Sequence, residues 1–185
     1  MNVSLIIGVD PGASGAISFL QPNGALFGIE DIPVDRIQVG KHSRSRVNIP
    51  RLWGLLQGLG NGTAVFIEKP NYRPMMKRNP KTGVPEPMQM GVAGAGAFGE
   101  TYGSLLAALV IAGAQIHEVA PGVWGRAIGL KGGKDDAIRL AGNLFPASAK
   151  LFARKMDHNR AEAALIGYYG AQKLRGEGHA VGTSV

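Results

Sequence analysis

Two short apolar runs in this chain each end in a carboxylate, Asp10 in the first and Glu68 in the second. A later segment of helical character adds His158 and Glu162, which are four residues apart and therefore share one face of a helix. Carboxylate oxygens bind Mg²⁺ while leaving room for water and a phosphate, and two such ions about 4 Å apart can promote displacement at phosphorus. An imidazole adds a softer ligand or a proton carrier. The residue types therefore indicate metal-dependent phosphodiester hydrolysis if the four side chains converge.

Each residue of this set also has an ordinary structural interpretation. Asp10 precedes a Pro-Gly pair and suits a turn, whereas Glu68 suits an ion pair at the end of a buried strand. His158 suits the start of a helix, with Asp157 as the N-cap. Glu162 lies among alanines near the buried face of its helix, where an unpaired carboxylate is costly. The four residues together are stronger support for a site than any one of them.

The glycine-rich turn at residues 11–15 allows a second interpretation. In sugar kinases and actin-like ATPases, an Asp followed by a turn of this kind cradles phosphate. Those proteins need a second, duplicated domain, and 185 residues are too few for one. A lone half of that fold is the remaining alternative.

The composition of the chain indicates the class of protein and the kind of partner to expect. The length suits one domain, expected at residues 1–175, and the polar, glycine-rich residues 176–185 are expected to form a flexible tail. The chain has no cysteine, no basic leader and no apolar run of membrane-spanning length, so we expect a cytoplasmic protein without a membrane partner, either associated with the nucleoid or in a phage-infected host cell. A net charge of +7 favours a polyanionic partner, and nucleic acid is the expected one.

The order of apolar and polar segments predicts an α/β fold with a mixed central β-sheet flanked by helices. Strands are expected at residues 3–10, 16–20, 25–29, 63–68 and 115–119. The first three should be antiparallel, and the fourth should be central and parallel because it is apolar throughout. Helical spacing indicates helices at residues 49–59, 91–112, 121–128, 135–144 and 159–174. The basic segments 32–48 and 69–90 lack apolar periodicity and are interpreted as loops.

Three segments resemble the signatures of RuvC-type Holliday junction resolvases. They are Ile7-Gly8-Val9-Asp10-Pro11-Gly12, Phe66-Ile67-Glu68-Lys69 and Asp157-His158-Asn159-Arg160-Ala161-Glu162-Ala163. The resemblance spans roughly residues 4–170 in the same order and spacing. Its late part, residues 131–163, is closer to phage and plant chloroplast resolvases than to bacterial ones.

The resemblance implies an RNase H-like fold and a crossover junction endodeoxyribonuclease that nicks four-way DNA junctions symmetrically with two Mg²⁺ or Mn²⁺ ions. Asp10, Glu68 and Glu162 would be metal ligands. Bacterial members carry an Asp at the position of Asn159, whereas the chloroplast-like pattern has a His at the position of His158. The expected fourth catalytic residue is therefore His158, with Asp157 in reserve.

The same resemblance implies a homodimer, because two equivalent sites can cut the two strands of a two-fold symmetric junction. The segment 91–109, rich in Gly and Ala, is the expected interface. Basic side chains are expected to contact the DNA: Lys69, Arg73, Lys77, Arg78, Lys131, Lys134, Lys155 and Arg160. Two other functions fit the sequence, a catalytically silent junction-binding protein and an RNase H-like nuclease for other branched DNA or RNA–DNA hybrids.

Overall fold

The structure is a computed structural model that describes residues 3–70, 75–88 and 91–180. Its elements follow one another as β1 (Leu5–Asp10), β2 (Ala16–Leu20), β3 (Leu26–Asp31), β4 (Val34–Val39), β5 (His42–Val47), α1 (Ile49–Leu56), β6 (Thr63–Glu68), β7 (Met75–Arg78), β8 (Pro85–Met88), α2 (Val92–Ile111), β9 (Gln115–Val119), α3 (Pro121–Ala127), α4 (Lys134–Leu144), the 3₁₀ helices η1 (Pro146–Phe152) and η2 (Lys155–Asp157), and α5 (His158–Ala180).

A five-stranded sheet in the order β3–β2–β1–β6–β9 forms the centre of the molecule. The first three strands pair antiparallel, as their short turns dictate. β6 pairs in parallel with both β1 and β9, and its inner residues are fully buried. The expected mixed sheet is confirmed. The apolar strand β6 is parallel and interior as expected, although β1 beside it is the central strand.

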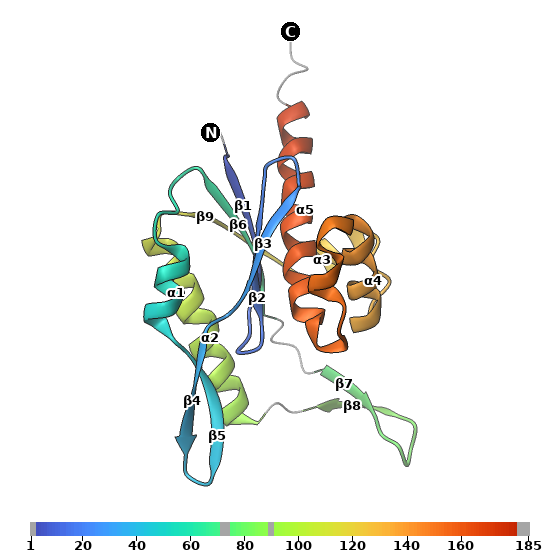
Figure 1. Cartoon of the computed structure of the whole chain (residues 1–185). Coiled ribbons are helices and arrows are strands. Elements are labelled where there is room, and N and C mark those ends of the chain that lie inside the picture. Colours follow the sequence, from blue (N-terminus) through green and yellow to red (C-terminus); the bar gives the residue numbers. More distant parts are fainter. Residues whose placement is uncertain (1–2, 71–74, 89–90, 181–185) are drawn as a thin grey trace.

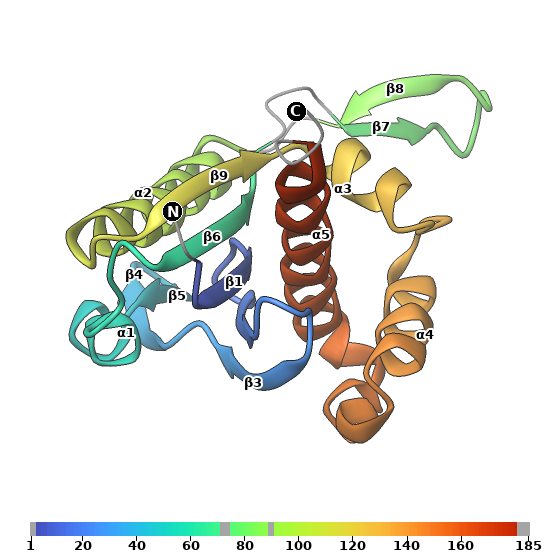
Figure 2. The same cartoon turned by 90° about the horizontal axis from the view of Figure 1, so that it is seen from above.

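Helices cover both faces of this sheet (Figures 1 and 2). α5 lies along one face, with α3 and α4 packed beside it. α1 and α2 cover the opposite face. The pleat divides the central strands between two cores: Ile6, Ala64 and Phe66 belong to the α5 side, whereas Ile7 and Val65 belong to the α1 and α2 side.

Both segments expected to be loops contain β-hairpins in their described parts, so those two predictions were wrong. β4 pairs with β5 and β7 pairs with β8, each as a separate two-stranded sheet that projects from the body of the molecule (Figure 1). Because such ribbons bury little, polar residues are tolerated on both faces and no apolar alternation marks them in the sequence. Glycines at positive φ, Gly40 and Gly83, allow the chain to reverse in the two hairpins.

Two helix ends differ from expectation by more than one residue. α1 ends at Leu56, three residues before the expected end, because Gly58 adopts a positive φ. α5 continues to Ala180, beyond the expected domain boundary at residue 175. Residues 181–185 lie outside the described part of the chain.

α2 is the one described helix that is long and apolar enough to cross a membrane by length and composition alone. A core helix of a soluble protein passes the same test. Its C-terminal half packs against the sheet through Tyr102, Leu105 and Leu109, whereas Val92 at its start is 91% exposed.

Candidate active site

Asp10 and Glu68 stand side by side at one edge of the central sheet. β1 and β6 are parallel, and the pair Val9 and Ile67 is the last in their register before these two residues. Neighbouring strands lie roughly 4.8 Å apart, so the two carboxylates emerge from adjacent backbone positions. Residues two positions earlier, Gly8 and Phe66, face α5. By the alternation of the strand, Asp10 and Glu68 also face the α5 side.

α5 packs directly against the backbone of β1. This contact places the carboxylate of Glu162, on α5, beside the two carboxylates at the strand ends. A Cβ atom at Gly8 would lie 2.1 Å from the carbonyl oxygen of Ala163, so only glycine permits this approach. The Ser18 hydroxyl on β2 donates a hydrogen bond to the same carbonyl at 2.8 Å. Glu162 directly precedes Ala163 and is thereby held next to the end of β1.

The pKa values of the three carboxyls show that these groups share one poorly solvated environment. Burial, followed by the charges of Glu162 and Glu68, raises the pKa of Asp10 from 3.8 to about 8. Burial is also the largest cause of the raised pKa of Glu68, to which Glu162 adds, and of the raised pKa of Glu162 itself. The structure therefore brings together three of the four residues that the sequence analysis expected to converge.

Lys134 contributes positive charge to this group. Its ammonium lowers the pKa of both Asp10 and Glu162, although burial outweighs this effect. Lys134 is the first residue of α4, after Gly132 and Gly133, whose φ values of 112° and 85° favour glycine. A cation next to the carboxylates suits a phosphate ligand, as the sequence analysis expected for this residue.

Trp124 is a site residue for which sequence reasoning proposed no role. Its indole Nε1 donates a hydrogen bond to Glu68 Oε2 at 2.8 Å, and its side chain is almost fully buried. This bond opposes the rise in the pKa of Glu68 because it stabilises the carboxylate. The available signal was chemical: a buried indole N–H needs an acceptor.

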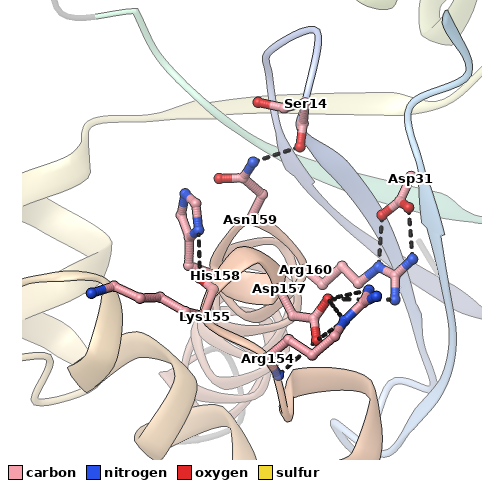
Figure 3. A network of polar contacts seen from close by, with 8 residues as sticks. All are labelled: Ser14, Asp31, Arg154, Lys155, Asp157, His158, Asn159 and Arg160. Carbon is pink, nitrogen blue, oxygen red and sulfur yellow. Dashed lines mark hydrogen bonds and ion pairs between the residues drawn. The ribbon is translucent and has the colours of Figure 1, made fainter.

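The start of α5 separates His158 from Asp157. The two side chains point in different directions around the helix axis (Figure 3). Asp157 is 3% exposed and accepts hydrogen bonds from the Arg154 backbone N–H at 2.9 Å and the Arg154 guanidinium at 2.7 Å. The Arg154 hydrogen bond holds the pKa of Asp157 below its usual range. Its partners are cations, and it does not join the three carboxyls as a reserve ligand.

His158 makes fewer polar contacts than Asp157. Its Nδ1 lies 3.2 Å from the Lys155 carbonyl oxygen, and its side chain is half-buried. One helical turn separates it from Glu162 on the same face of α5. The role of His158 as fourth ligand or proton carrier stays a prediction.

Asn159 and Arg160 fasten the start of α5 to the sheet (Figure 3). The Asn159 amide donates to the Ser14 carbonyl oxygen in the β1–β2 turn at 2.5 Å. The Arg160 guanidinium binds both carboxylate oxygens of Asp31 at 2.7 and 2.6 Å, in the two-pronged geometry that suits these groups. Arg160, expected to contact DNA, is thus engaged within the protein.

The other expected DNA contacts lie on several elements. Lys69 Nζ lies 4.0 Å from Glu118, and the Lys131 backbone N–H donates to Asp136. The remaining members are Lys77 and Arg78 on β7 and Lys155 on η2. Arg73 lies outside the described residues.

The three carboxylates fit a hard divalent cation by the chemistry of their donors. They supply only oxygen, and their raised pKa values show that the nearby positive charge does not offset theirs. Within residues 3–70, 75–88 and 91–180, no three His, Asp or Glu side chains already form a group that could hold a metal ion. Asp10, Glu68 and Glu162 are the residues that would hold such an ion.

No protein-family model matches the sequence, and no curated protein matches it significantly. Among solved structures, the RuvC of T. thermophilus in complex with a Holliday junction substrate superposes with a TM-score of 0.53 at 13% identity, covering 92% of this chain and 94% of that one. A Thermus thermophilus RuvC structure gives a TM-score of 0.50 at 14% identity, covering 94% and 96%.

This chain has the fold of RuvC. The likeness covers nearly the whole length of both chains and confirms the RNase H-like α/β fold that the sequence resemblance implied. At these identities it is a likeness of fold, and the site rests on the residues themselves. In this chain the carboxyls of Asp10, Glu68 and Glu162 gather on the α5 side of that fold.

Proposed function

We propose that this protein is a metal-dependent endonuclease that resolves four-way DNA junctions by paired symmetric nicks. The observation that carries the proposal is the convergence of Asp10, Glu68 and Glu162, from two strands and a helix, on one face of a RuvC-like fold. The choice of a junction as substrate is supported by the solved neighbour, which holds a Holliday junction. The net charge of +7 suits a DNA partner.

Asp10, Glu68 and Glu162 would hold Mg²⁺ or Mn²⁺, two ions in the site. Bound ions supply a nucleophilic water and stabilise the leaving oxygen. Trp124 orients Glu68 through its N–H, and Lys134 places a positive charge beside Asp10 and Glu162, where it would attract a phosphate. His158 stands one turn away as a further ligand or proton carrier.

A homodimer with α2 at its interface would place two such sites on one junction. The outer face of α2 carries Gly96, Gly99 and Gly103, and an added Cβ at each of them would meet only open space. Val110 and Ile111 at its end are 65% and 72% exposed. A bare stripe of this kind allows a second helix to approach closely, which supports the proposed interface.

The test is cleavage of a labelled mobile four-way junction in Mg²⁺, compared with a linear duplex of matched sequence and with an RNA–DNA hybrid. We expect paired, symmetric nicks in the junction alone, from a species that sediments as a dimer. Junction binding without nicks would favour a silent junction-binding protein. Equal cutting of the hybrid would favour an RNase H-like activity on other substrates.

A further inference from the structure

The β4–β5 hairpin, residues 34–47, stands apart from the carboxyl site and from the elements expected to contact DNA. It forms its own two-stranded sheet. Figure 1 shows it projecting past the end of the central sheet at which β1 turns into β2, on the opposite side from the β7–β8 hairpin. Asp10 is the last residue of β1, so the hairpin and the carboxyl site lie toward the same end of the sheet.

The pleat sorts the polar side chains of the hairpin onto two unlike faces. Cross-strand partners point to the same side of a ribbon, so Arg36 with Ser45 and Gln38 with Ser43 share one face. No Asp or Glu of the hairpin lies on this face. We call it the Arg36 face.

The opposite face is occupied by contacts within the protein. Asp35 accepts hydrogen bonds from the Asn48 amide at 3.0 and 2.9 Å. Glu100 on α2 pairs with Arg46 at 2.5 Å and with Arg44 at 3.7 Å. The two pairs with Glu100 fix the hairpin to α2. Asp35, the only acid in either strand, and two of the arginines are therefore engaged within the protein. Among the described residues, Arg36 takes part in no ion pair.

We infer that the Arg36 face binds the phosphate backbone of a duplex arm leading away from the cleavage site. Arginine and serine are typical phosphate ligands, and a face without acids carries no repulsion. The Gln38 amide donates to the Gly40 carbonyl oxygen at 3.1 Å, which leaves Arg36, Ser43 and Ser45 as the contact set. The inference rests on the proposed function, since it takes branched DNA as the ligand.

The experiment measures the dissociation constant of the wild-type protein and two variants for a labelled four-way junction, without divalent metal, over a series of salt concentrations. Each lost phosphate contact reduces the slope of log K against log salt by about 0.9. Arg36→Ala should weaken binding and reduce this slope by about that amount, whereas Arg36→Lys should keep most of it. Arg44→Ala is the matched control, because it removes the same charge from the same hairpin on the opposite face.

We expect Arg44→Ala to leave the slope near that of the wild type. Equal losses in Arg36→Ala and Arg44→Ala would reduce the effect to general electrostatics and overturn the inference, as would no loss in Arg36→Ala. Shortening the arms of the junction should abolish the difference between the wild type and Arg36→Ala, because the contact lies on the arm. A difference that persists on the shortest arms would place Arg36 at the junction centre and contradict the assignment.

Cleavage assays on the same preparations separate this inference from the proposed function. If the wild type binds and nicks the junction while Arg36→Ala binds equally well, only the hairpin inference fails. If the wild type neither binds nor nicks any branched DNA, the proposed function fails, and the hairpin inference fails with it.

Discussion

The glycines on the two faces of the central sheet have different roles. On the α5 side, Gly8 and Gly167 remove side chains where helix and strand meet, so that backbone packs against backbone. On the other side, the glycines of α1 and α2, such as Gly54 and Gly103, face open space. Glycine on the first face permits a close contact, and on the second it leaves surface uncovered.

The two faces also differ in the charged side chains that they bury. The buried side chains of α1 and α2 include no Asp or Glu. The α5 side combines an apolar core with Asp10, Glu68 and Glu162, whose pKa values are all raised by burial. A helix that approaches the sheet backbone this closely can hold a carboxylate against the strand ends and exclude water there. Close packing on one face is therefore the structural condition for the site, and each prediction below tests that relation.

The largest expected effect is that of Glu68→Gln on cleavage. The substitution keeps the shape of the side chain and removes the charge that would bind the metal ion. Because even indirect partners of metal ligands cost up to about 100-fold when lost, cleavage of the junction should fall by more than that, while junction binding without metal stays unchanged. Gel assays of both properties check it. Unchanged cleavage would remove Glu68 from the site.

A large loss of stability is expected when the close contact itself is filled. Gly8→Ala places a methyl group 2.1 Å from the Ala163 carbonyl oxygen and 2.3 Å from the Gly167 nitrogen, both of them backbone atoms that cannot move alone. The free energy of unfolding should fall by about 3 kcal/mol, at the upper end of the usual cost of overpacking. Cleavage should fall as well, because Glu162 moves with α5.

Gly54→Ala is the matched control for Gly8→Ala on the opposite side of the sheet. Gly54 lies inside α1, where a new methyl group meets no atom within 4 Å. Here alanine should raise the free energy of unfolding by up to about 1 kcal/mol through its helix propensity. Urea denaturation of both variants measures the contrast. Equal destabilisation by the two substitutions would show that the α5 contact is not special.

Part of the site could be predicted from the sequence. Asp10 and Glu68 were predictable because each ends a short apolar run, and adjacent parallel strands bring such ends together. Glu162 was predictable from the alanines around it, which mark a buried helix face. The α/β class and the mixed sheet followed from the same runs.

Other features depend on geometry that no local pattern encodes. Trp124 meets Glu68 across 56 residues of sequence, and only the orientation of α3 makes the contact. The choice between Asp157 and His158 depends on where α5 begins, because that position turns Asp157 toward Arg154. The hairpins were missed because ribbons that bury little need no apolar alternation. Apolar patterns in a sequence indicate which residues are buried. They do not indicate which polar groups will contact one another or where polar strands pair.

Trp124→Phe should produce a smaller change than Glu68→Gln or Gly8→Ala. Phenylalanine fills most of the buried volume but donates no hydrogen bond to Glu68. Loss of an indirect partner of this kind costs about 10- to 100-fold in metal affinity. The Mg²⁺ concentration that gives half-maximal cleavage should rise by that factor, with cleavage largely restored at high Mg²⁺.

Trp53→Phe is the control for that experiment, because Trp53 lies on α1, on the other side of the sheet, and is 38% exposed. Its Mg²⁺ dependence should match the wild type. This variant also leaves Trp124 as the only indole, so its fluorescence should change as Mg²⁺ binds. A Trp124→Phe protein with wild-type Mg²⁺ dependence would show that the hydrogen bond does not orient the ligand.

The pH dependence of stability in metal-free protein should reflect the raised pKa of Asp10. The pKa of Asp10 is about 8 in the folded protein, against 3.8 for the fully solvated carboxyl. Between these pH values the folded state therefore keeps a proton that the unfolded chain has lost. The free energy of unfolding contributed by this group therefore falls as pH rises through that window. Asp157 has the opposite sign, because its pKa is lowered by Arg154 and its contribution is lost only as pH falls below 3.8. Urea denaturation in chelator at a series of pH values should show a decline from about pH 4 to about pH 8 that Asp10→Asn makes smaller and Asp157→Asn leaves in place, while the raised pKa values of Glu68 and Glu162 maintain the remainder. A decline as large in Asp10→Asn as in the wild type would mean that the carboxyl at the end of β1 does not carry the excess proton.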